Sequence, residues 1–148
     1  MILNGENVTS LLRTEETGKM ASKTSKYAEV RTKLVALQRG LAKKTDVIMD
    51  GRDIGTTVLP DAFAKIYLTA SSDARAKRRY DELKEKGENC SFDAIKEDIE
   101  KRDYEDMHRA ISPLKQADEA VLVDTSDMNI EQVVAALSKI IDEKKAGR

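Results

Sequence analysis

The side chains best suited to chemistry lie in a seven-residue stretch, Asp50-Gly51-Arg52-Asp53-Ile54-Gly55-Thr56. The apolar run Val47-Ile48-Met49 comes directly before it and is typical of a buried parallel strand that ends in a carboxylate. Open α/β sheets bind ligands at this edge. The planar Arg52 guanidinium can bind a phosphate. The Asp50 and Asp53 carboxylates can hold magnesium-bound water or accept hydrogen bonds from a nucleotide base. A strand-end turn with solvated charges is the structural alternative.

A second charged cluster lies on a helix predicted from Ser91 to about His108. Positions 95, 99, 102, 106 and 109 are spaced by four and three residues, so they share one stripe of the helix. The stripe begins with isoleucines and ends in Arg102, Asp106 and Arg109. The carboxylate is spaced to pair with both arginines, and an anion would neutralise the positive charge left over. An ion network with a purely structural role is the alternative.

Composition restricts the class of protein. The 148 residues fit one domain, and the net charge of -1 gives no electrostatic reason to expect a nucleic-acid or membrane partner. No apolar run is long enough to span a membrane and no signal peptide is visible, so we expect a cytoplasmic protein. Cys90 and His108 are the only residues of their types, which excludes a multi-cysteine metal site and an internal disulfide.

Apolar periodicity predicts helices that alternate with strands. Helices are expected at about 13–22, 25–41, 71–86, 91–108 and 129–141, and strands at 47–49, 66–68 and 120–123. Asn4-Gly5 predicts a hairpin turn near the start. The order predicts a layered α/β domain with a parallel sheet and right-handed crossovers.

Two of these helices carry apolar stripes that should face a core. The first, with Ser25 as its expected N-cap, presents Val30, Leu34, Leu37 and Leu41. The last begins at Asn129, whose spacing to Gln132 resembles a capping box. It is expected to bury Ile130, Val133, Val134, Leu137, Ile140 and Ile141.

Taken together, these segments resemble the bacterial cytidylate kinases, P-loop nucleoside monophosphate kinases that phosphorylate CMP and dCMP. The matching segments are 2–8, 13–14, 21–22 with Arg31 nine residues on, 50–56, 101–110 and 112–114. The resemblance implies a three-layer P-loop kinase domain with a parallel sheet, ATP as phosphoryl donor and Mg²⁺ as cofactor. It divides the single domain 1–148 into three parts. These are a CMP-binding insertion with the following helix at 1–44, a core at 45–72 and 110–148, and a lid with flanking helices at 73–109.

The resemblance also implies roles for individual residues. Ser22, Arg31 and Asp53 would read the cytosine edge, where a hydroxyl, a guanidinium and a carboxylate suit the groups of that base. Asp106, held by Arg102, would contact the sugar hydroxyls.

The phosphate contacts come from other residues. Arg52 and Arg109 would grip the CMP phosphate, and Arg13 falls within a matching segment as a further substrate-binding residue. Among the arginines that flank the lid, Arg75, Arg78 and Arg79, we expect Arg78 to act near the transferred group. Asp50 resembles the carboxylate near magnesium, which it would reach through water, and no direct metal ligand is assigned.

One family motif is missing from these 148 residues. The family opens with a strand, a P-loop ending in Gly-Lys-Ser/Thr and a helix, whereas Gly18-Lys19 lacks the upstream strand and the spaced glycine. We therefore expect a chain that lacks the first strand, the P-loop and the first helix, through truncation or because another polypeptide supplies them. Alone, it should turn over little or no CMP and fold weakly or as an oligomer.

Two other functions stay open. The chain could be a CMP-binding module without catalysis, or a structural remnant whose sheet edges recruit a partner. Within the kinases, specificity for uridylate is disfavoured by Ser22, Arg31 and Asp53.

Overall fold

The structure of the protein is a computed structural model that describes residues 1–12 and 14–147. The chain forms two compact units, Met1–Ile48 and Met49–Arg148. No helix among the described residues is long and apolar enough to cross a membrane.

The first unit opens with the predicted hairpin. Strands β1 (Ile2–Leu3) and β2 (Glu6–Asn7) pair antiparallel. Asn4 and Gly5 join them with φ angles of 50° and 89°. A two-residue turn of this type requires left-handed backbone at both positions, which asparagine and glycine tolerate best. The hairpin prediction is therefore confirmed.

A short 3₁₀ helix at Thr9–Leu11 and two α-helices follow in the described part of the first unit. Helix α1 (Glu15–Thr24) begins where the Thr14 hydroxyl accepts a hydrogen bond from the backbone N–H of Thr17. Helix α2 (Ala28–Ala42) follows Tyr27, so the prediction that Ser25 caps it was wrong. The Ser25 hydroxyl instead donates to the carbonyl of Ser22 at 2.9 Å, which ties it to the end of α1.

The apolar stripe of α2 does not reach a core. Leu34, Leu37 and Leu41 are 49–58% exposed, and Val30 is 39% exposed. The periodicity correctly predicted a helix and its apolar face, but it could not show whether another element would cover that face.

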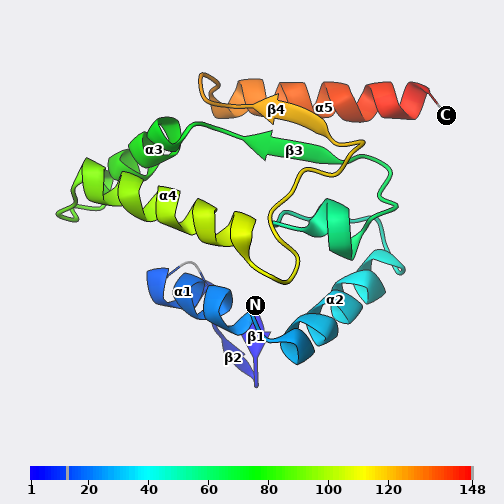
Figure 1. The fold of residues 1–148 in the computed structure, drawn as a ribbon, viewed down its shortest axis with the longest axis horizontal. Coiled ribbons are helices and arrows are strands. Elements are labelled where there is room, and N and C mark those ends of the chain that lie inside the picture. Colours follow the sequence, from blue (N-terminus) through cyan, green and yellow to red (C-terminus); the bar gives the residue numbers. More distant parts are fainter. Residues whose placement is uncertain (13, 148) are drawn as a thin grey trace. The chain divides into compact units, whose positions relative to one another are not determined.

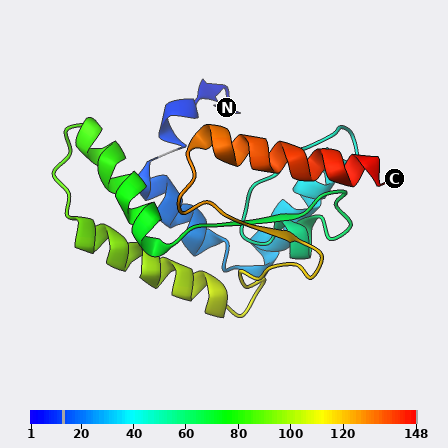
Figure 2. The same ribbon diagram turned by 90° about the horizontal axis from the view of Figure 1, so that it is seen from above.

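The second unit contains a parallel pair of strands. β3 (Ile66–Thr69) pairs with β4 (Val121–Asp124), with Ile66 opposite Val121. Both strands were predicted. Helices α3 (Ser72–Glu85) and α4 (Phe92–His108) pack against each other, and α5 (Ile130–Ala146) runs beside the strands in both views (Figure 1 and Figure 2). The buried apolar core consists of Val58, Ala70, Ala76 and Val123.

The strand predicted at 47–49 is absent, and this prediction was wrong. Residues 46–50 have no regular structure, and Ile48 is 99% exposed. A strand needs a hydrogen-bonded neighbour, and in the described part of the chain β3 and β4 pair only with each other. An apolar run is therefore not sufficient to make a strand here.

The last helix starts as predicted but buries less. Asn129 and Gln132 form both hydrogen bonds of the capping box. Ile130 and Val134 were expected inside, yet they are 83% and 56% exposed. Val133, Leu137, Ile140 and Ile141 are half-buried. A sheet of two strands covers only a narrow stripe of the helix, which explains the difference.

A buried lysine fixes the start of β3. The Lys65 side chain is 6% exposed, and its ammonium donates to the exposed carboxylate of Glu119. This hydrogen bond lowers the pKa of Glu119 below its ordinary value of 4.5. A lowered folded-state pKa stabilises the fold above the ordinary pKa, and that stabilisation is lost as pH falls through the folded-state value.

We therefore expect Glu119→Gln to lower the melting temperature at neutral pH and to flatten its fall below about pH 4.5. Thermal melts from neutral to acidic pH measure both effects. Glu97→Gln, at an exposed position of α4, is the matched control and should melt like the wild-type chain. Parallel acid limbs for the Glu119 variant and the wild type would contradict the argument.

Candidate functional site

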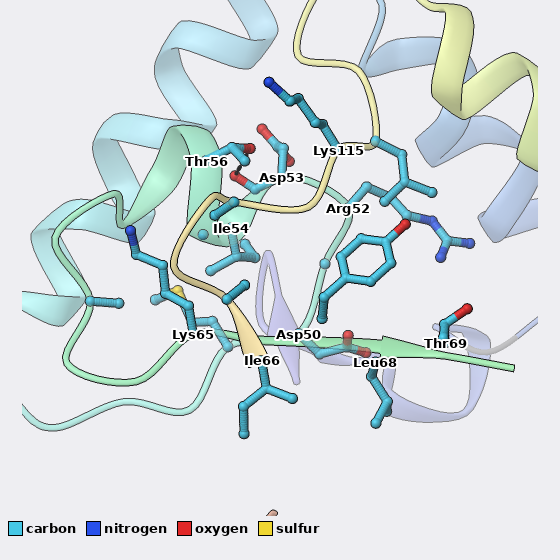
Figure 3. Close-up of a pocket in the computed structure, with 18 of the residues that line it drawn as sticks. Asp50, Arg52, Asp53, Ile54, Thr56, Lys65, Ile66, Leu68, Thr69 and Lys115 are labelled. Atoms are coloured by element: carbon cyan, nitrogen blue, oxygen red, sulfur yellow. Dashed lines mark hydrogen bonds between the residues drawn. The ribbon is translucent and has the colours of Figure 1, made fainter. Parts of the chain in front are cut away.

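A cavity of about 390 Å³ lies in the second unit. It is bounded by the stretch 49–56 and by β3, with further lining from α3, α4 and the segment that precedes β4. Figure 3 shows Arg52 and Asp53 extending in different directions from their stretch, with Lys115 on the same side as Asp53. Charged groups from segments far apart in sequence therefore meet around one hollow.

The stretch 50–56 places Asp53 in the wall of this cavity. Asp53 is 9% exposed, and its carbonyl accepts hydrogen bonds from the backbone N–H groups of Thr57 at 2.8 Å and Val58 at 3.2 Å. These bonds open a π-helical turn over Ile54–Val58, a rare element that is frequent at functional sites. A Cβ on residue 51 would lie 2.9 Å from Cγ1 of Ile54. Any residue other than glycine at this position would therefore force the Ile54 side chain to move.

Asp106 is the meeting point of two arginines. Its Oδ2 lies 3.0 Å from Nε of Arg52, and its Oδ1 lies 3.6 Å from Nη1 of Arg109. The Asp106 side chain is 13% exposed, whereas that of Arg52 is 48% exposed. One carboxylate thus faces two guanidinium groups, which leaves a local excess of one positive charge.

The pairing predicted between Arg102 and Asp106 is not found among the described residues, and this expectation was wrong. Arg102 is exposed, and Asp106 turns instead to Arg52 and Arg109. Helical spacing allows a pair four residues apart, but a better-placed cation from the 50–56 stretch takes the carboxylate.

Arg109 is held in place and yet incompletely satisfied. Its side chain is 17% exposed, and its Nε donates to the carbonyl of Ser112 at 2.6 Å. Its Nη2 is buried and has no hydrogen-bond partner in the described structure. A buried guanidinium nitrogen without an acceptor is costly, and an anion would satisfy it.

The arginines of α3 are engaged by the protein. Arg75 donates to both carboxylate oxygens of Asp103, at 3.1 and 2.6 Å, and to the carbonyl of Ala70 at 3.0 Å. Arg78 donates to the carbonyl of Thr125 in the loop after β4. Both line the cavity. Arg79 pairs with Glu82 along its own helix at 2.9 Å.

The remaining predicted residues lie in different places. Asp50 is exposed and lines the cavity, and no group of three metal-ligating side chains occurs among the described residues. Ser22 on α1 and Arg31 on α2 belong to the first unit and are half-buried. Arg13 lies outside the described residues.

Sequence reasoning missed several cavity residues, among them the charged Asp103 and Lys115. A signal for Asp103 was present, because positions 96, 100 and 103 form a second polar stripe on α4. This stripe meets the start of α3 through Lys96 with Asp73 at 2.8 Å and Glu100 with Ser72 at 2.8 Å, next to the Arg75–Asp103 pair. Lys115 stands in an irregular segment and carries no such periodic signal.

Comparison with known proteins places the chain in a family. Residues 1–143 match the cytidylate kinase family. The cytidylate kinases of Lactobacillus johnsonii and Lactobacillus gasseri are each 51% identical over 143 residues, which covers 97% of this chain and 62% of each relative. That of Leuconostoc mesenteroides is 49% identical over 142 residues, covering 96% of this chain and 63% of the relative. The chain thus spans less than two thirds of the length of these relatives, and it belongs to the cytidylate kinase family.

Proposed function

We propose that the protein takes part in phosphoryl transfer from ATP to CMP or dCMP. These 148 residues supply the binding site for the nucleotide that accepts the phosphoryl group. The observation that carries this proposal is the Arg52–Asp106–Arg109 cluster with its buried, unsatisfied Nη2. A monoanionic or dianionic phosphate is the ligand that such a cluster suits, because arginine binds phosphate through paired, charge-assisted hydrogen bonds.

The roles proposed for single residues follow from this cluster and the family. Arg52 and Arg109 bind the CMP phosphate. Asp106 orients both arginines and, together with Arg102, contacts the sugar hydroxyls. Support for Asp106 comes from its two ion pairs and its low exposure.

Recognition of the base is assigned to Ser22, Arg31 and Asp53, with Arg13 as an additional substrate-binding residue. A site built from polar side chains rejects a base that leaves them unpaired, which favours cytosine. The burial of Asp53 beside the cavity supports its part in this set.

Phosphoryl transfer needs positioning and charge neutralisation more than covalent chemistry by the protein. Arg78 is proposed to stand near the transferred group, since it lines the cavity from α3. Bound Mg²⁺ would neutralise phosphate charge. Asp50 is the residue proposed to hold its water shell, because it lines the cavity at the start of the 50–56 stretch.

The proposed role of each segment of the chain follows the organisation of the family. Residues 1–44 contribute the CMP-binding insertion and the following helix, 45–72 and 110–148 the core, and 73–109 the lid with its flanking helices. Close packing of α3 on α4 supports movement of 73–109 as one body. Oligomerisation, or a further segment from another chain, is proposed to complete the sheet.

The donor side is the part that these residues do not supply. No Gly-x-x-x-x-Gly-Lys-Ser/Thr sequence occurs in the 148 residues, so the backbone cradle for the ATP phosphates is missing from them. We therefore propose that this chain alone has little or no kinase activity.

Two measurements on the purified chain test the proposal. Calorimetry with CMP is expected to show binding, and a coupled assay with ATP, Mg²⁺ and CMP is expected to show no ADP release above background. Binding without turnover is also the result for a non-catalytic CMP-binding module. Adding an N-terminal P-loop segment taken from a relative distinguishes the kinase hypothesis from the non-catalytic module. Only the kinase hypothesis predicts that turnover then appears. Turnover by the 148 residues alone would refute the missing donor site, and absence of CMP binding would refute the acceptor site.

A further inference from the structure

We propose that the turn at Ser112-Pro113 aims Arg109, which makes Ser112 a positioning residue of the phosphate site. The inference rests on the proposed function for its ligand, and on the geometry of residues 106–114 for its mechanism. The turn decides which nitrogen atoms of Arg109 remain available to a phosphate.

The turn closes the end of α4. The helix ends at His108, and Arg109 has extended backbone, with φ -65° and ψ 142°. The chain then bends back at Ser112, so that the backbone N–H of Leu114 donates to the carbonyl of Asp106 at 2.8 Å. That carbonyl belongs to the last turn of α4 and has no partner within the helix. The bend therefore anchors the backbone of Asp106 and encloses Arg109.

The same bend fixes the Arg109 guanidinium. The Ser112 carbonyl accepts from Nε at 2.6 Å, while Nη1 faces Asp106 at 3.6 Å. Nη2 is buried and has no hydrogen-bond partner in the described structure. A freely rotating arginine could donate to a phosphate from Nε, Nη1 or Nη2. Here Nε and Nη1 face protein groups, so Nη2 is the nitrogen presented to a ligand. The turn thus selects the edge that a ligand meets.

Ser112 holds an unusual backbone conformation to do this. Its φ is 47°, in the left-handed region that side chains with a Cβ disfavour, and it precedes a proline. Its hydroxyl lies 3.4 Å from that of Thr57, which belongs to the π-helical turn after Asp53. Glycine adopts this φ without penalty, while a β-branched residue strongly resists it. Substitution at this position can therefore keep or break the turn without touching Arg109.

Ser112→Gly and Ser112→Val are the matched pair that tests the proposal. The first readout is the NMR signal of the Arg109 Nε–H, assigned by its disappearance in Arg109→Lys. We expect the signal to persist in the glycine variant and to be lost or shifted in the valine variant. The second readout is calorimetry with CMP and with cytidine, which lacks the phosphate. Ser112→Val is expected to lower CMP affinity by about 10-fold and to leave cytidine affinity unchanged, because one charge-assisted hydrogen bond is misdirected.

Other results of these measurements would contradict the proposal or the proposed function. An unchanged Nε–H signal in Ser112→Val would overturn the proposal, as would equal losses of CMP and cytidine affinity, which indicate a structural role only. If Ser112→Val fails to fold, Ser112→Thr introduces the same β-branch while keeping a hydroxyl, and it is judged by the same signal. If the wild-type chain binds no CMP, the proposed function fails, and the Nε–H signal alone decides whether the turn holds Arg109.

Discussion

Arg109→Met should weaken CMP binding by about 10- to 100-fold while leaving the free energy of unfolding within about 1 kcal/mol of wild type. The loss of affinity follows from removing the charge-assisted hydrogen bonds that Nη2 offers to a phosphate. The small effect on stability has a separate cause. Nη2 is buried without a partner in the free protein, so its removal relieves a desolvation cost that offsets the lost bond to Ser112. Methionine keeps much of the side-chain volume.

Urea unfolding and CMP calorimetry on the same preparation measure both quantities. Lys101→Met is the matched control, since it removes a cation from an exposed position of α4. This control should retain CMP affinity, which separates a local effect from a general loss of positive charge. A large destabilisation by Arg109→Met with unchanged CMP affinity would show that Arg109 has a structural role instead of a ligand-binding one.

Helix starts could be predicted from the sequence because caps are local. Ser71, Ser91 and Asn129 each accept a hydrogen bond from a backbone N–H three residues ahead, as their sequence positions indicated. Ser25 shows the limit of this reasoning. A serine between two helices can serve the end of one or the start of the next, and here it serves the end of α1.

Elements that depend on distant partners were harder to predict. The run at 47–49 has a strand composition, but a strand also needs a neighbour, and neither β3 nor β4 provides one. The same reason explains the exposed stripes of Leu34 on α2 and Val134 on α5. Periodicity shows which face of a helix is apolar, but it does not show how much surface is available to cover it.

The candidate site shows the same division between local and distant contacts. The approach of Arg109 to Asp106 at helical spacing could be predicted, and it is found. The pair with Arg52 crosses from α4 to a loop far away in sequence, and no periodic pattern links the two. The carbonyl of Ser112 that holds Arg109 is a backbone group, which residue types do not reveal. Sequence identifies the charged residues, whereas the fold decides their partners.

Asp106→Ala should reduce both the stability of the fold and the affinity for CMP, whereas Arg109→Met should reduce mainly the affinity. The reason is that Asp106→Ala removes the anion that both arginines share. We expect a destabilisation of about 1–3 kcal/mol, since Arg109 is then a half-buried cation with no carboxylate beside it. CMP affinity should fall by at least about 10-fold, because Arg52 and Arg109 no longer converge on one point. Urea unfolding and calorimetry measure these effects, with Asp98→Ala on the exposed side of α4 as the control.

The double variant Asp106→Ala/Arg109→Met gives the sharpest test of this reasoning. If the cost of Asp106→Ala comes from an unpaired Arg109, then removing that cation as well should restore much of the lost stability. Arg52 needs no such rescue, because its side chain is 48% exposed and water can solvate it. The double variant should therefore be more stable than Asp106→Ala and still fail to bind CMP tightly. Additive losses of stability would mean that Asp106 acts through Arg52 or the backbone, and that Arg109 is not the group it neutralises.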